Sequence, residues 1–178
     1  MKRYERTFLI GEKDLIRFHC ERCYREKLLG MLAMAVAGAL IVLLYSSQLP
    51  WRPSDLELGL MIAGGFVLAL VFMVLGAWLV TSRQVRSSMK KQGITEYQQA
   101  VRVDGFGVRV QANGKEGKLG FEHLHMVRET GTDLYIYITP TQAWLLPKSQ
   151  MADPEAECAQ LREIFTTVVE PRRLKLRK

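Results

Sequence analysis

The chain has 178 residues, of which 48% are hydrophobic and 24% are charged, and its formal net charge is +7. The apolar residues are concentrated in two windows without a charged side chain, residues 28–51 and 58–82, and are not spread as in the core of an ordinary soluble domain. The basic residues gather beside these windows and at the end of the chain, so residues 93–170 hold more acidic than basic groups. That distribution lacks the basic stripe of a nucleic-acid-binding domain, and we do not expect nucleic acid as a partner.

Residues 1–27 are predicted to form a short N-terminal strand and then a juxtamembrane helix that starts near Glu12 and runs into the first apolar window. The sequence leaves open whether the strand segment Phe8–Ile10 joins a sheet formed by the C-terminal half. The helix carries a run of basic side chains ahead of the window: Lys13, Arg17, Arg22, Arg25 and Lys27.

The segment FHCERC places Cys20 and Cys23 three residues apart on one face of this helix. As a zinc site, the two thiolates would need further ligands from His123, His125 or Cys158, because zinc signatures pair such a motif with a second one. A thioredoxin-type redox motif lies between a strand and the helix that follows it, and this segment does not have that strand-then-helix setting. Packing of the thiols against a neighbour needs no further group and is the interpretation that we favour. We therefore predict no metal and no cofactor.

The two apolar windows are predicted to form a transmembrane helical hairpin over residues 28–82, because about 20 apolar residues cross the hydrocarbon region as a helix. Basic residues lie before the first window and after the second, whereas the connection PWRPSDLE offers only Arg52, so the positive-inside rule places both termini in the cytoplasm. Pro50 and Pro53 suit a turn, and Trp51 and Trp78 lie near the ends of the windows, where aromatic rings favour the headgroup layer. We expect a multi-pass protein of a bacterial inner membrane.

Small residues recur on one face of each window, and we expect the two helices to pack through them. They are Gly30, Ala33 and Ala37 in the first window and Gly65, Ala69 and Gly76 in the second. The same faces could support a homo-oligomer. Neither window contains Asp, Glu, Lys, Arg or His, which indicates an anchor in the lipid bilayer and not a transport pathway. The basic flanks are expected to attract anionic lipid headgroups.

Residues 93–170 are predicted to form a small cytoplasmic α+β domain, a bent antiparallel sheet with a C-terminal helix. In QAVRVDGFGVRVQ, a two-residue turn at Asp104-Gly105 would place Arg102 and Arg109 outward. The opposite face would then be apolar and consist of Val101, Val103, Phe106, Val108 and Val110.

The rest of this domain is expected to form about six strands in total and one helix. After a turn at Asn113-Gly114, strands are predicted near Glu116–Phe121 and in the segments HLHMVRE, TDLYIYIT and TQAWLLP. Asp153 and Pro154 have the pattern of a helix N-cap followed by proline at the first position. The apolar stripe of the helix is Cys158, Leu161, Ile164, Phe165 and Val168, Pro171 ends it, and residues 171–178 form a basic tail.

Four segments of the chain stand out in this order: YERTFLIGEKDLIRF at the start, the VRVDGFGVRV hairpin, FEHLHMVRETGTDLYIYIT, and AWLLPKSQM followed by PEAECAQLREIF. In these segments and in the order of its features, the chain resembles the YcxB-like family of bacterial membrane proteins. Where this chain has Phe121, the family pattern has a tryptophan. The resemblance implies two membrane spans and a C-terminal domain of pleckstrin-homology-like fold, and it brings no established activity.

Few residues form a pattern of known chemistry. His123 and His125 would alternate on one strand and face the same side, as a pair of imidazoles or, more simply, as solvated positions. No nucleophile with a histidine and an acidic partner, and no phosphate-binding loop, is recognisable. We expect a non-enzymatic, membrane-anchored interaction or scaffold module with an unknown protein partner, and the candidate contact residues are Lys148, Trp144, Arg102 and Arg109. The alternative is a metal- or redox-responsive membrane sensor that uses Cys20 and Cys23.

Overall fold

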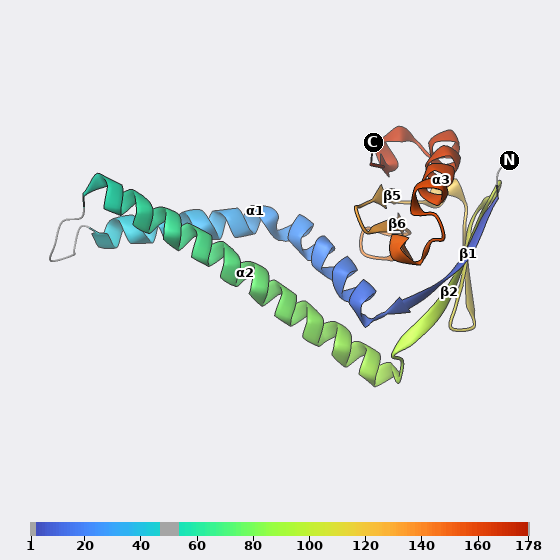
Figure 1. The fold of residues 1–178 in the computed structure, drawn as a ribbon, viewed down its shortest axis with the longest axis horizontal. Helices are drawn as coiled ribbons and strands as arrows, with labels where there is room; N and C mark the ends of the chain where they lie inside the picture. Colours follow the sequence, from blue (N-terminus) through green and yellow to red (C-terminus); the bar gives the residue numbers. More distant parts are fainter. Residues whose placement is uncertain (1–2, 47–53, 178) are drawn as a thin grey trace. The chain divides into compact units, whose positions relative to one another are not determined.

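The structure is a computed structural model that describes residues 3–46 and 54–177 (Figure 1). It divides into a helical unit, residues 15–91, and a β domain built from residues 1–14 and 92–178. The predicted turn with Pro50, Trp51 and Pro53 lies outside the described residues.

The helical unit contains two long helices, α1 (Glu12–Ser46) and α2 (Asp55–Gln92). Among the described residues, one segment is long and apolar enough to cross a membrane, Leu56–Gln92, with a mean hydropathy of 2.7 in its most apolar window. α1 contains a shorter apolar stretch, Leu32–Tyr45. One of the two predicted windows therefore lies in a helix that is long and apolar enough to cross a membrane, and the second window does not meet that criterion among the described residues.

The prediction that small residues bring the two helices together is wrong in this structure. Gly30, Ala33, Ala37 and Gly65 are exposed, and a Cβ added at Gly30 or Gly76 would meet no atom within 4 Å. A small residue promotes helix packing only where the neighbouring backbone comes close. A contact between the helices is made instead by a large side chain, because the Tyr24 hydroxyl donates a hydrogen bond to the Val74 carbonyl at 3.1 Å.

The β domain contains two four-stranded sheets and the helix α3 (Pro154–Val168), which lies beside β5 and β6 in Figure 1. In the first sheet, the order of strands is β1 (Tyr4–Gly11), β2 (Glu96–Asp104), β3 (Gly107–Ala112) and β4 (Lys115–Leu119). In the second sheet, the order is β7 (Ala143–Pro147), β6 (Asp133–Tyr137), β5 (Met126–Glu129) and β8 (Leu174–Lys175). Neighbouring strands are antiparallel except β5 and β8, which are parallel.

The pairing of β1 with β2 answers the question that the sequence leaves open. The strands are antiparallel, from Tyr4 opposite Val103 to Gly11 opposite Glu96. Tyr4, Phe8 and Ile10 turn inward and are buried. The N-terminal strand is thus an edge of the sheet, directly before α1, and its neighbour β2 begins four residues after the end of α2.

The β2–β3 hairpin forms as predicted, but its turn is shifted by one residue. Asp104 lies opposite Gly107, so the two turn residues are Gly105 and Phe106. The Asp104 side chain accepts a hydrogen bond from the Phe106 backbone N–H at 3.0 Å, which closes the turn locally. The prediction that Phe106 belongs to the apolar face is therefore wrong, and its side chain is 80% exposed.

The helix α3 has the predicted start and the predicted apolar face. The Asp153 carboxylate accepts hydrogen bonds from the N–H groups of Glu155 and Ala156, and Pro154 occupies the first position. Its buried side chains are Cys158, Leu161, Ile164 and Phe165, while Val168 is half-buried. The Phe165 ring meets the Phe121 ring edge to face, with 6.3 Å between centroids, and this contact anchors the helix on the domain core.

The segment expected as a basic tail forms part of the domain. After the short helix η3 (Pro171–Arg173), β8 pairs with β5, with Leu174 opposite Val127. The Arg173 guanidinium donates to the carbonyls of Glu122 and Leu124 at 2.8 and 3.1 Å. Backbone pairing and these two bonds together hold the segment in place.

We expect Gly107→Ala to lower the unfolding midpoint of the β domain more than Gly114→Ala does. Both glycines have positive φ, 148° and 71°, a region that costs other residues about 1 to 2 kcal/mol. A Cβ at position 107 would also lie 2.2 Å from the Leu119 carbonyl oxygen, whereas one at position 114 meets nothing within 4 Å. Thermal unfolding of the full chain in detergent, followed by circular dichroism, compares the two variants. Equal midpoints would contradict the clash with Leu119.

Candidate functional site

Lys148, a candidate contact residue, belongs to an ionic cluster around Glu129. Its Nζ donates hydrogen bonds to Glu129 Oε1 and to the Thr130 carbonyl, both at 2.7 Å. Arg162 of α3 binds both oxygens of the same carboxylate at 2.6 Å, and the Arg177 N–H approaches it at 3.3 Å. The Glu129 side chain is fully buried. Lys148 therefore has a structural task, holding β5 and the end of β7 together.

The ionic cluster lowers the pKa of the Glu129 carboxyl group. Burial raises the pKa of Glu129, but the hydrogen bonds from Arg162 and Lys148 outweigh it and hold the pKa at about 2, below the usual 4.5. The carboxylate is thus charged at every physiological pH, and it is unsuited to act as a general acid.

A second polar cluster joins β1 to α3 through Glu157. The Glu157 carboxylate accepts hydrogen bonds from the Tyr4 hydroxyl at 2.8 Å, from the Arg6 guanidinium, and from the Ala152 N–H at 2.8 Å. Burial and the bond to Glu157 raise the pKa of Tyr4 far above its usual value. The residues of this cluster hold the N-terminal strand on the domain.

One edge of the first sheet is covered by a side chain. The Gln150 amide donates to the Leu9 carbonyl and accepts from the Leu9 N–H, each at 2.7 Å, and so takes the place of a neighbouring strand at that point of β1. The other edge strand, β4, has only β3 as a neighbour among the described strands and carries Lys115, Glu116 and Lys118. Such charges discourage unspecific pairing of an open edge.

Arg102 and Arg109, two further candidates, lie opposite each other on β2 and β3 and are half-buried. Both approach the Asp104 carboxylate, at 3.6 and 3.7 Å. The Nε atom of each guanidinium is buried without a hydrogen-bond partner. Together with Phe106 in the adjoining turn, they form what we call the hairpin surface: Arg102, Arg109 and Phe106.

Trp144, the last of the interaction candidates, is half-buried on β7 and packs toward the first sheet. A Cβ added at Gly117 of β4 would lie 3.2 Å from the Trp144 ring, so the glycine makes room for the indole. The ring thus lies between β7 and β4, where it contributes to packing of the two sheets.

His123 and His125 are not on a strand, in contrast to the prediction. His123 ends the short helix η1 (Phe121–His123), and His125 precedes β5. The reason is that Phe121 turns into the core against Phe165, which ends the extended segment at Leu119. Both imidazoles are exposed beside a shallow hollow that Arg173 also borders.

The three cysteines have different surroundings. Cys20 is buried, and burial raises the pKa of its thiol although Thr81 hydrogen-bonds to it. Cys23 is half-buried, and Cys158 is buried in the core with its sulfur 3.9 Å from that of Met151. The described residues contain no group of three or more metal-ligating side chains. The sensor hypothesis stays a prediction.

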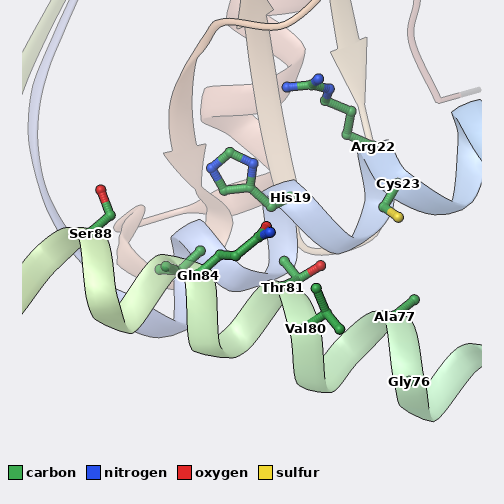
Figure 2. Close-up of a pocket in the computed structure, with 10 residues that line it drawn as sticks. His19, Arg22, Cys23, Gly76, Ala77, Val80, Thr81, Gln84 and Ser88 are labelled. Atoms are coloured by element: carbon green, nitrogen blue, oxygen red, sulfur yellow. The ribbon is translucent and has the colours of Figure 1, made fainter.

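The helical unit contains a cleft of mixed polar and apolar lining that the sequence did not predict (Figure 2). Its volume is about 590 Å³. The lining residues from α1 are His19, Arg22 and Cys23, and α2 contributes Gly76, Ala77, Val80, Thr81, Gln84, Val85 and Ser88. In Figure 2 the Gln84 side chain points toward α1. The sequence signal for this cleft is a set of polar residues at helical spacing: Thr81, Gln84 and Ser88. They lie at the end of the second apolar window and just beyond it.

The comparison with protein families gave one match, to the model of the YcxB-like protein family over residues 103–165. The match covers about a third of the chain, from the end of β2 to α3, and it includes Phe106, Glu129 and Lys148. No curated protein and no solved structure matched the chain.

We expect the β domain to lose about 3 kcal/mol of stability through Glu129 as the pH falls from 4.5 to 2, at 1.36 kcal/mol per pKa unit. Because the folded pKa lies below the unfolded value, this contribution is complete above pH 4.5 and disappears as the pH falls through about 2. Denaturant unfolding across this range should show a weaker acid dependence in Glu129→Gln than in wild type. Glu116→Gln, at an exposed position, should behave as wild type does; equal slopes in all three proteins would contradict the assignment.

Proposed function

We propose that this protein is a non-enzymatic interaction module whose β domain is anchored at a membrane and binds a protein partner there. The observation that carries the proposal is the pairing of β1 with β2, which builds one domain from chain on both sides of the helical unit. The helical unit is therefore an insertion in the chain of the β domain, and neither end of it is free of that domain. The buried Glu129 and the half-buried Glu157 serve to hold the domain together, which agrees with a binding role.

The same pairing supports two membrane spans through a simple count of crossings. Gly11, at the end of β1, lies opposite Glu96, at the start of β2, so the chain leaves the domain and returns to it on one side. If α2 crosses a bilayer once, the chain between residues 12 and 95 must cross it a second time. α1 is the remaining long helix of that segment, and 35 residues give it a length of about 52 Å, at about 1.5 Å per residue, well above the hydrocarbon thickness of about 30 Å.

The charges indicate which side the domain occupies. Residues 83–91, which follow the apolar part of α2, carry Arg83, Arg86, Lys90 and Lys91 and no acidic group. By the positive-inside rule we place the domain and both termini in the cytoplasm and the protein in a bacterial inner membrane. We further propose a pleckstrin-homology-like fold for the domain, which is supported by its two mainly antiparallel sheets and the C-terminal helix α3.

The hairpin surface is the contact that we propose for the protein partner. Phe106 is the most exposed large apolar side chain of the described β domain, and it lies in the turn of the hairpin that carries Arg102 and Arg109. Aromatic residues and arginine are the residue types that contribute most binding energy at protein interfaces. A partner with acidic side chains would also be attracted by the guanidinium groups of Arg102 and Arg109, whose side chains are 38% and 36% exposed.

The topology predicts that a cysteine at position 48 is labelled from outside the cell. A membrane-impermeant maleimide should modify Gln48→Cys in intact cells, because this position lies in the proposed connection between the two spans. The wild-type protein, whose three cysteines are at positions 20, 23 and 158, should be labelled only after permeabilisation. Protection of Gln48→Cys in intact cells, followed by labelling after lysis, would contradict a hairpin that opens outward.

The hairpin surface predicts a specific photo-crosslink in living cells. Benzoylphenylalanine at position 106 should give a discrete protein adduct, and Arg102→Glu combined with Arg109→Glu should reduce its yield about tenfold or more, because like charges across an interface cost several kcal/mol. The same analogue at Gln111, an exposed position on β3, is the control and should give no such adduct. Equal adducts from both positions, or adducts with lipid alone, would contradict a protein partner at this surface.

A further inference from the structure

We propose that the edge strand β4 pairs with β4 of a second copy of this chain, antiparallel and about a two-fold axis at Gly117. In this register Glu116 of each copy lies opposite Lys118 of the other, and the first sheets of the two copies join into one continuous sheet. The contact uses the open edge of β4 and not the exposed ring of Phe106. It therefore goes beyond the proposed function.

Among the edge strands of the two sheets, β4 is the one with an uncovered edge of useful length. The other edge strands are β1, β7 and β8. The Gln150 amide covers β1 at Leu9, and the Leu145 carbonyl of β7 accepts a hydrogen bond from the Gln99 amide at 2.7 Å. β8 has only two residues. Exposed edges of this kind are where strands of another chain are added.

The backbone of β4 suits pairing in the proposed register. The two-residue turn 113–114, whose φ angles are 51° and 71°, makes Lys115 part of a hydrogen-bonded pair with β3. Such pairs alternate along antiparallel strands, so Gly117 also bonds to β3, whereas the N–H and C=O groups of Glu116 and Lys118 point away from it. No described residue makes a backbone hydrogen bond to these outward groups. They are free to pair with a second copy.

The side chains of β4 make the strand complementary to itself. Gly117 faces the core, next to the Trp144 ring, whereas Glu116 and Lys118 share the outer face and are exposed. A two-fold axis at Gly117 creates the pair of Glu116 with Lys118 twice, once in each direction. Each of these pairs would also exchange both of its backbone N–H···O bonds. Opposite charges in facing positions stabilise a pair of strands.

The outer face of the first sheet has a row of basic side chains that ends at β4. Arg102, Arg109 and Lys118 lie in register on β2, β3 and β4. Glu5 of β1 lies beside Arg102 and closes the row at one end, and Asp104 approaches the two arginines at 3.6 and 3.7 Å. At the β4 end, the next position in the row belongs to no strand of the same copy. A carboxylate of the second copy beside the lysine supplies the missing negative charge.

Other ways of pairing two β4 strands bring like charges together. Parallel pairing in register places each Lys118 beside Lys118 of the other copy. Antiparallel pairing centred on Glu116 or on Lys118 places that residue opposite itself. Like charges in directly opposite positions are destabilising, so the segment KEGKL selects the register centred on Gly117. The charges that discourage unspecific pairing of this edge thus permit one specific pairing.

The experiment measures the self-association of the full chain in detergent by sedimentation over a concentration series. We expect a dimer that dissociates on dilution, because exposed ion pairs contribute little free energy. Unfolding of Glu116→Gln at low protein concentration therefore concerns single chains. Glu116→Lys and Lys118→Glu should each weaken the dimer about tenfold or more, since each makes both attractive pairs repulsive. The matched control Lys175→Glu, an exposed charge reversal on β8, should change the dissociation constant by less than about twofold.

An equimolar mixture of the two weakened variants provides the decisive test. A dimer of one Glu116→Lys chain and one Lys118→Glu chain again has opposite charges at both facing positions. The double variant Glu116→Lys/Lys118→Glu has them within a homodimer. Both should associate within about threefold of wild type, as expected when the two positions interact directly. A monomeric wild type, single variants that associate like wild type, or a mixture as weak as its components would overturn the proposal.

A proline separates pairing of strands from attraction between side chains alone. Lys118→Pro removes an outward N–H and leaves the bonds to β3 in place, because proline is tolerated on an edge strand where its nitrogen faces solvent. Lys118→Ala removes the same charge and keeps the N–H. We expect the proline variant to associate more weakly than the alanine variant, with circular dichroism as the check that both keep the β domain. Equal association of the two would contradict strand pairing.

Discussion

The antiparallel pairing of β1 with β2 is the interaction on which the rest of the molecule depends. It closes a long loop of chain between Gly11 and Glu96, and the entropy lost on closure grows only slowly with such length. Burial of Tyr4, Phe8 and Ile10 offsets this loss, together with the ladder of backbone hydrogen bonds. Once the strands are paired, Gly11, directly before α1, lies opposite Glu96, four residues after the end of α2. The chain therefore leaves and re-enters the β domain at the same sheet.

Two buried or half-buried carboxylates then tie α3 to the strands. Arg162 of α3 reaches Glu129 of β5, and Glu157 of α3 reaches Tyr4 and Arg6 of β1. Replacement of buried ion pairs by apolar residues is often neutral or stabilising, so their value lies in fixing one arrangement more than in raising stability. Here they specify which residues of α3 meet which strand. The N-terminal strand and the C-terminal helix are thereby joined across almost the whole length of the sequence.

The sequence predicted the elements that depend on local rules and missed those that depend on distant contacts. The N-cap Asp153, the Asn113-Gly114 turn and the alternation around Val101 and Val103 follow from nearby residues alone, and all are present. The turn at Gly105-Phe106 was misplaced by one residue because the pattern of alternation fits either turn, and only the Asp104 side chain decides. Lys148 could not be recognised as structural, since its partner Glu129 lies on another strand. The cleft escaped prediction for the same reason, because it needs two helices.

An exposed phenylalanine by itself carries little information, since single apolar side chains are common on protein surfaces. The surroundings of Phe106 give it weight. The same hairpin holds Arg102 and Arg109 opposite each other, although like charges in facing positions are unfavourable, and their Nε atoms are buried without a hydrogen-bond partner. Asp104 relieves the repulsion only in part, at 3.6 and 3.7 Å. Both side chains are nevertheless 38% and 36% exposed, which leaves their outer guanidinium nitrogens open to an acidic group of the proposed partner.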